Sequence, residues 1–155
     1  MTEALSLLNP TDFDKLLQAA DRSGHPYRDR ALLHLFWHFG PSPRQVLALT
    51  MQDVNFLAAR VRWPRGGEQP LPPEVLQALT SYISFERDAR CARLFCGRRG
   101  RPLTAVQLDA FFRRLRALSG VPVTPRILRM CALFRMLRTN PVRAMTAVMG
   151  RRPAR

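Results

Sequence analysis

Prolines that directly follow capping residues mark the starts of several helices in this sequence. Asn9-Pro10, Ser42-Pro43, Thr124-Pro125 and Asn140-Pro141 each place a side chain able to cap a helix directly before a proline. Proline has no backbone N–H and its φ is already helical, so it fits the first position of a helix and breaks later ones. The sequence therefore predicts a domain of several short helices with fixed starting points.

A different pattern interrupts the helices between residues 54 and 71. Val61 and Trp63 alternate with arginines, and Gly66-Gly67 marks a turn before a short return strand at 69–71. The predicted fold class is mainly α with one small antiparallel β-sheet, an α+β arrangement. Helices are predicted at 10–20, 27–39, 43–49, 73–85, 104–118, 125–138 and 141–149.

The charge of the chain is strongly one-sided. The formal net charge is +14, from 25 lysines and arginines against 11 acidic residues. Lys15 is the only lysine. A GC-rich genome would explain the excess of arginine over lysine but not the net charge. A domain this basic ordinarily binds a polyanion. The arginine guanidinium can donate two parallel hydrogen bonds to one phosphate, so nucleic acid is the predicted partner.

Other features narrow the class of protein. The sequence has no run of 18 apolar residues, which disfavours a membrane span, and no secretory leader begins at Met1. Three cysteines without a leader predict reduced thiols and a cytoplasmic location. His34 and His38 have the spacing of a two-histidine metal face, but we expect a solvated polar stripe there. No zinc pattern closes around the cysteines, so no metal or other cofactor is predicted.

The segment 124–130 reads Thr-Pro-Arg-Ile-Leu-Arg-Met. It resembles the active-site helix of the tyrosine recombinases, or phage integrases, whose pattern is Thr-Pro-His-x-Leu-Arg-His. Further matches keep the family order over roughly residues 6–152: Arg28–Leu33, Gln45–Leu49 with Asp53-Val54, Pro70-Leu71, Leu94-Phe95 and Met149-Gly150. The resemblance implies a single catalytic-type domain at 6–152, without the N-terminal core-binding domain and without the C-terminal helix that carries the nucleophilic tyrosine.

The resemblance also implies that the catalytic set is degenerate. Arg129 matches the retained arginine of the helix, but Arg126 and Met130 stand where the pattern has histidines. Ser42 stands where the first catalytic arginine belongs, and Arg65 where the hairpin lysine belongs. We therefore expect no strand cleavage by this chain: the protein is not predicted to be an enzyme, unless a partner supplies the tyrosine.

Several arginines are predicted to contact DNA phosphates. Arg126 and Arg129 lie three apart, on one helix face near the helix start, where backbone N–H groups favour an anion. The alternative is that both are ordinary solvated arginines. Arg44 lies about 200° around a helix from the missing arginine and is an outlying contact, as is Arg113. The basic loop Arg98-Arg99-Gly100-Arg101 fits phosphate binding and a solvated face equally well. The predicted phosphate-binding residues are Arg44, Arg65, Arg113, Arg126, Arg129 and Arg151.

Two classes of function remain open. The leading hypothesis is a catalytically inactive, integrase-like protein that binds duplex DNA and regulates transcription or recombination. The alternative is a protein–protein module with an open groove that accepts a helix from an active recombinase or from a second copy. An eroded gene remnant is a third possibility. Membrane binding is disfavoured, because apolar residues wrap nearly the whole 125–138 helix and predict a core helix.

Overall fold

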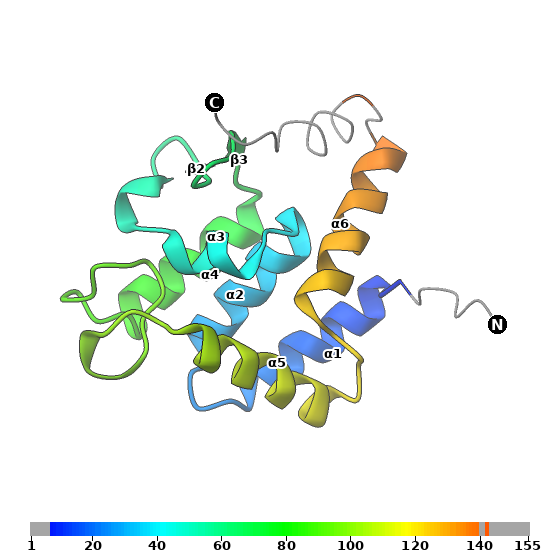
Figure 1. Ribbon diagram of the computed structural model, residues 1–155, viewed down its shortest axis with the longest axis horizontal. Helices are drawn as coiled ribbons and strands as arrows, with labels where there is room; N and C mark the ends of the chain where they lie inside the picture. The colour runs from blue at the N-terminus through cyan, green and yellow to red at the C-terminus, as the bar shows by residue number, and fades with distance from the viewer. Residues whose placement is uncertain (1–6, 140–141, 143–155) are drawn as a thin grey trace.

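The computed structural model describes residues 7–139 and 142. Six α-helices and three short strands make up most of this part of the chain, which confirms the predicted fold class (Figure 1). The helices are α1 Pro10–Asp21, α2 Pro26–Phe39, α3 Pro43–Ala48, α4 Pro73–Phe85, α5 Ala105–Ser119 and α6 Pro125–Thr139. The strands are β1 Val54–Asn55, β2 Arg60–Arg62 and β3 Glu68–Pro70, and single 3-10 turns occupy Met51–Asp53 and Arg98–Gly100.

Helix α2 forms the centre of the core. Every residue from Ala31 to Trp37 is buried, and the helix packs against α1, α4 and α6. Figure 1 shows α3 in front of α2 and α4, with α5 crossing below and α6 standing at one side. A helix whose stretch from Ala31 to Trp37 is apolar except for His34 needs cover from several neighbours, which explains its central place.

The small sheet has the strand order β1-β2-β3 and is antiparallel throughout. Val61 of β2 is fully buried and pairs with Val54 on one side and Gln69 on the other. The arginines that flank Val61 lie on the opposite face, as the alternating pattern predicts. Trp63 is buried directly after β2 and donates its indole N–H to Oε1 of Gln69 at 2.8 Å.

The predicted helix starts are confirmed where the structure describes them. Asn9, Ser42 and Thr104 each cap a helix, and each cap is reciprocated by the side chain three residues later. Gly40 and Gly120 end α2 and α5 in the left-handed conformation. The helix predicted at 141–149 lies outside the described residues.

The prediction that the 125–138 helix is a core helix is wrong for most of its circumference in the described part of the chain. Only Leu128, Cys131 and Ala132 of α6 are buried, whereas Phe134 and Leu137 are 42% and 41% exposed. The reason is that α6 packs against the core along one face. The apolar composition of a helix does not show how many neighbours cover it.

The prediction of a solvated His34 is also wrong. His34 is buried, with the ring of Phe13 from α1 at 5.3 Å between centroids. Burial, together with the nearby positive groups His38 and Arg30, lowers the pKa of His34 to about 4, so the ring is neutral at pH 7. The packing of α1 onto α2 covers a position that the helix alone would leave at its polar edge.

The remaining sequence predictions concern cysteines and membrane spans. Cys91, Cys96 and Cys131 are buried free thiols. Within the part of the chain that the structure describes, no three potential ligands gather in a metal-binding group. No helix among those residues has the length and apolar character to cross a bilayer.

Candidate nucleic-acid interface

The end of α2 lies directly against α6. Gly40 has φ of +56°, and a Cβ built on it would lie 2.8 Å from the Cα of Arg129 and 3.3 Å from the Arg129 carbonyl oxygen. Both the backbone conformation and the lack of space require glycine here. This contact fixes the backbone of Arg129 beside the loop that leads from α2 into α3.

The start of α3 is closed by its own side chains. The Ser42 hydroxyl accepts the Gln45 N–H at 3.2 Å, and the Gln45 carbonyl Oε1 accepts the Ser42 N–H at 3.0 Å. Ser42 is therefore a helix cap at the position where the recombinase pattern has its first arginine. Arg44, between them, is exposed.

The β2–β3 turn lies next to this cap. Arg65 is exposed with φ of +56°, and a Cβ on Gly66 would lie 3.0 Å from Cβ of Trp63 and 3.6 Å from Nε2 of Gln45. The N–H of Trp63 bonds the Gly67 carbonyl at 3.1 Å and closes the turn. The turn that carries Arg65 and the helix that carries Arg44 are thus neighbours through Gln45.

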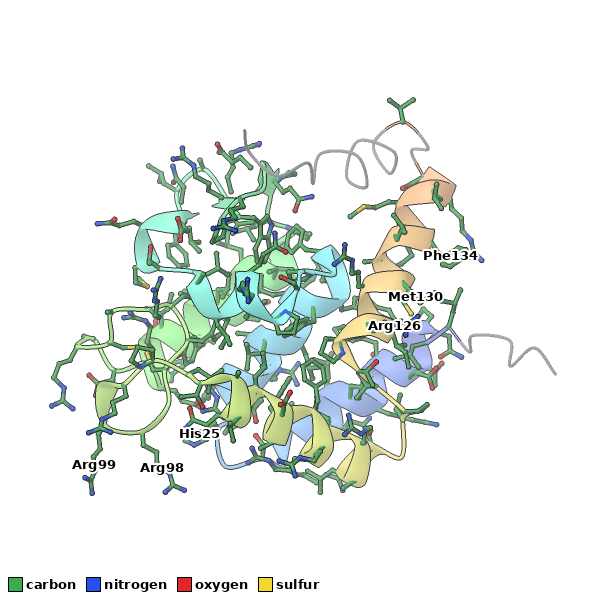
Figure 2. The ribbon with its side chains drawn as sticks, viewed as in Figure 1. His25, Arg98, Arg99, Arg126, Met130 and Phe134 are labelled. Atoms are coloured by element: carbon green, nitrogen blue, oxygen red, sulfur yellow. The ribbon has the colours of Figure 1, made fainter. Side chains whose placement is uncertain are left out.

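The start of α6 is formed by Thr124 and Pro125. The Thr124 hydroxyl accepts the Ile127 N–H at 3.1 Å, and Pro125 occupies the first helical position. Arg126 and Arg129 are both exposed, and within residues 7–139 neither has an ion-pair or hydrogen-bond partner for its guanidinium. In Figure 2, Arg126 lies on α6 in one row with Met130 and Phe134.

These contacts bring together the segments that carry Arg44, Arg65 and Arg129, around the loop from Gly40 to Gln45. Arg126 lies one turn before Arg129 on α6, in the row of Met130 and Phe134. Arg113 lies on the exposed side of α5, and no hydrogen bond or ion pair in the described part of the chain joins it to this group. Arg151 lies outside the described residues. We call the set Arg44, Arg65, Arg126 and Arg129 the arginine cluster.

Several other arginines serve the fold. Arg28 is buried and paired with Asp29 at 3.0 Å. Arg87 donates to three backbone carbonyl groups of the 91–94 loop, and Arg93 donates to the Ala48 carbonyl at 2.9 Å. Sequence reasoning did not separate these structural arginines from binding ones. Only the Arg-Asp pair at 28–29, inside an apolar helix, carries a signal of burial.

Arg135 is the clearest structural arginine on α6. Its Cζ lies 4.1 Å from the centroid of the Trp37 ring, and its guanidinium donates to the Trp37 carbonyl. Burial lowers the pKa of Arg135 from its usual value, although the group stays charged. It points to the core side of α6, away from Arg126.

Arg116 of α5 also has a structural contact. It is half-buried and donates to the Val123 carbonyl at 3.1 Å. Among residues 7–139, the exposed arginines whose guanidinium groups have no hydrogen-bond or ion-pair partner are Arg44, Arg62, Arg65, Arg98, Arg99, Arg101, Arg113, Arg114, Arg126, Arg129 and Arg138.

The fold is that of the catalytic domain of tyrosine recombinases. The crystal structure of XerA recombinase superposes with a TM-score of 0.77 at 21% identity, over 92% of this chain and 55% of that one. The Tn1549 transposon integrase in complex with circular intermediate DNA gives a TM-score of 0.77 at 21% identity, over 96% and 58%. The sequence matches the phage integrase family over residues 6–152, and the chain belongs to that family.

Curated relatives agree with this assignment. The tyrosine recombinase XerC of Rhodospirillum centenum is 36% identical over 110 residues, which cover 66% of this chain and 32% of the relative. XerC of Azotobacter vinelandii is 31% identical over 132 residues, or 79% and 44%. The chain therefore spans less than half the length of these two relatives.

Proposed function

We propose that this chain is a recombinase-type domain that binds duplex DNA through phosphate contacts and does not cleave it. The arginine cluster carries the proposal, because its four side chains are exposed, lack partners among residues 7–139 and lie around one loop and one helix start. Arg113 is assigned as an outlying contact, and Arg151, which lies outside the described residues, is retained as a phosphate contact of the same site. Solved relatives include recombinases in complex with DNA, which supports duplex DNA as the ligand.

The positive charges of the cluster are more favourable with a phosphate bound than with water alone. Arg126 and Arg129 are one turn apart and repel each other when no anion lies between them. A phosphodiester there would accept charge-assisted hydrogen bonds from both and would face the positive end of α6. Such contacts hold the backbone without reading bases, so the proposed binding is salt-sensitive and only weakly sequence-selective.

The lack of cleavage is inferred from the groups that occupy the catalytic positions. Ser42 caps α3 and supplies no positive charge. Arg65 can hold a phosphate, but a guanidinium with a pKa above about 12 is a poor proton donor to a leaving oxygen. The arginine cluster thus supplies binding and charge neutralisation without a general acid.

Neither tyrosine of the sequence is placed to act as nucleophile. Tyr82 is buried, and its hydroxyl oxygen accepts the Cys96 N–H at 3.0 Å. Tyr27 lies near the start of α2, thirteen residues before Gly40, which corresponds to about 20 Å along the helix. A protein that covers recombination or promoter sites without cutting them is the biological role that this arrangement supports, and it acts in the cytoplasm.

Two comparisons test the proposal. The first is binding of a mixed-sequence duplex by fluorescence anisotropy, with Arg126→Ala/Arg129→Ala beside Arg101→Ala/Arg114→Ala, which loses the same charge at two exposed arginines assigned no contact with the duplex. The cluster variant is expected to weaken binding about 10-fold or more, and the control by less. Equal losses would place the DNA elsewhere. The second is a nicking assay on a supercoiled plasmid, where any cleavage at sites bound by purified protein contradicts the inactivity.

A second candidate function rests on the outer face of α6. Met130, Phe134 and Leu137 lie there, and the last two are more than two-fifths exposed in the described structure. This ridge is apolar enough to receive a helix from an active recombinase or from a second copy of the chain. Phe134→Ser would then abolish a complex seen by light scattering and leave DNA binding unchanged. If the protein stays monomeric at all concentrations and does not bind an added recombinase, this second function is rejected.

We further infer that residues 6–152 form one domain. Limited proteolysis that leaves one fragment of this extent would support the boundaries, and a stable smaller fragment would contradict them.

A further inference from the structure

Two exposed aromatic side chains lie together at the end of the molecule opposite the arginine cluster along α2. Tyr27 at the start of α2 is 40% exposed, and Phe85 at the end of α4 is 70% exposed. Their ring centroids are 5.1 Å apart, and the ring planes are inclined by 36°. Exposed rings in contact form an apolar surface that neither the fold nor the proposed duplex contact uses.

The backbone around these rings is firmly held. Both carboxylate oxygens of Glu86 accept backbone N–H groups, from Tyr27 at 2.8 Å and from Arg28 at 3.2 Å. The buried Arg28 guanidinium donates in turn to the Cys96 carbonyl at 3.4 Å. The start of α2, the end of α4 and the base of the 97–101 loop are therefore connected, and the two rings are positioned before any ligand arrives.

Two exposed arginines lie on the loop that contacts the segment following Phe85. The 97–101 loop packs beside the residues that follow Phe85, since a Cβ on Gly100 would lie 3.1 Å from Oδ2 of Asp88. Arg98 and Arg99 of this loop are exposed, and within residues 7–139 their guanidinium groups have no hydrogen-bond or ion-pair partner. Figure 2 shows both pointing outward on the same side as His25, the residue two before Tyr27 and far from Arg126.

The nearby acidic groups are already engaged. Glu86 caps α2, and the Asp88 carboxylate is paired with Arg90 at 2.7 Å, which holds the pKa of Asp88 at about 2. Arg114 of α5 lies close enough to help burial and Arg28 lower the pKa of His25. Asp29 and Glu86 oppose that lowering, so the positive charge available to a ligand on this side comes from the exposed side chains of Arg98 and Arg99.

We propose that Tyr27 and Phe85 form a stacking platform for the bases of single-stranded nucleic acid, with Arg98 and Arg99 holding its phosphates. Aromatic faces beside a basic groove or loop are the general requirement for binding unpaired strands. A duplex cannot use the platform, because its bases are stacked inside the helix. A protein partner fits poorly, because two partly exposed side chains offer far less than the roughly 800 Å² per partner that a stable interface buries.

The test measures anisotropy of a labelled oligothymidylate of about 20 nucleotides, with the full chain as wild type, as Phe85→Ala and as Tyr27→Ala/Phe85→Ala. Leu57→Ala is the matched control, because Leu57 is a fully exposed apolar residue on the β1–β2 turn. We expect about 5-fold weaker binding for Phe85→Ala, about 10-fold or more for the double variant and no change for the control. Thermal melting checks that each variant is folded. If the double variant does not fold, the affinity of Phe85→Ala alone is used for the test.

The outcome is independent of the duplex proposal. Oligothymidylate binding that depends on the rings, in a protein that fails to bind duplex, supports the platform and rejects the proposed function. Oligothymidylate binding that is equal in all variants overturns the platform, as does no binding at low salt. Loss of affinity for duplex and single strand alike in Phe85→Ala would also overturn it, because a base platform must spare the duplex.

Discussion

Gly40, the residue that ends α2, lies directly against Arg129 of α6: a Cβ on Gly40 would lie 2.8 Å from the Arg129 Cα. The atoms of Arg129 that meet Gly40 belong to the helix backbone. They cannot move aside to make room for a larger residue at position 40, as the end of a flexible side chain could. One glycine therefore sets where the arginine cluster stands relative to the start of α3.

Gly40→Ala is expected to destabilise the protein by roughly 2–4 kcal/mol, because it adds a left-handed-conformation penalty to a steric clash. Urea denaturation of Gly40→Ala and Gly120→Ala separates the two causes. Gly120 has φ of +72° with nothing within 4 Å of its Cβ position, so its substitution reports backbone strain alone. Equal losses in the two variants would show that the contact with α6 contributes nothing.

Arg135→Ala should cost about 1–3 kcal/mol of stability, because it removes the stacking on Trp37 and a charge-assisted bond to the Trp37 carbonyl. Arg135→Lys should recover only part of this loss, since an ammonium lacks the planar face that stacks. Arg138→Ala, which removes an exposed arginine of the same helix, is the control. A full rescue by lysine would mean that charge alone matters at position 135.

His34 should make the protein less stable in acid. Its folded pKa is lowered to about 4 from the ordinary value of 6.5, so between these pH values the unfolded chain binds more protons than the folded one. Stability from this group is complete above pH 6.5 and is lost as the pH falls toward 4. In urea denaturation at several pH values, His34→Leu should flatten this dependence. An unchanged pH dependence would assign the effect to other groups, such as His38.

Ser42→Ala should lower stability by about 1 kcal/mol, because the Gln45 N–H loses its cap. Duplex affinity should change less than twofold, since Ser42 is assigned to the helix and not to the DNA. Thr104→Ala removes the equivalent cap from α5 and should cost a similar amount. A large loss of DNA affinity in Ser42→Ala alone would give the hydroxyl a binding role.

Local signals predicted the elements well because their causes are local. The Ser42–Gln45 capping box and the Gly40 helix end follow from side chains within a few residues, and the structure has both. The alternation around Val61 likewise placed the central strand. These features need no knowledge of the distant chain.

Burial and partnership could not be predicted in the same way. His34 is covered by Phe13, which comes from another helix, and Arg135 is stacked on Trp37, which lies far away in sequence. The exposed Phe134 shows the converse, since its apolar character did not reveal that its face of α6 has no neighbour in the described chain. The same long-range packing decides which arginine side chains have a partner within the fold and which remain able to bind a phosphate.

The salt dependence of duplex binding tests the central claim most directly. A plot of log affinity against log salt concentration has a slope of about −0.9 for each phosphate neutralised. If Arg126 and Arg129 each neutralise one phosphate, Arg126→Ala/Arg129→Ala should reduce the steepness of the slope by about 2 relative to the wild type, while the whole curve moves to weaker binding. An unchanged slope in a folded double variant would mean that the DNA does not lie on the arginine cluster.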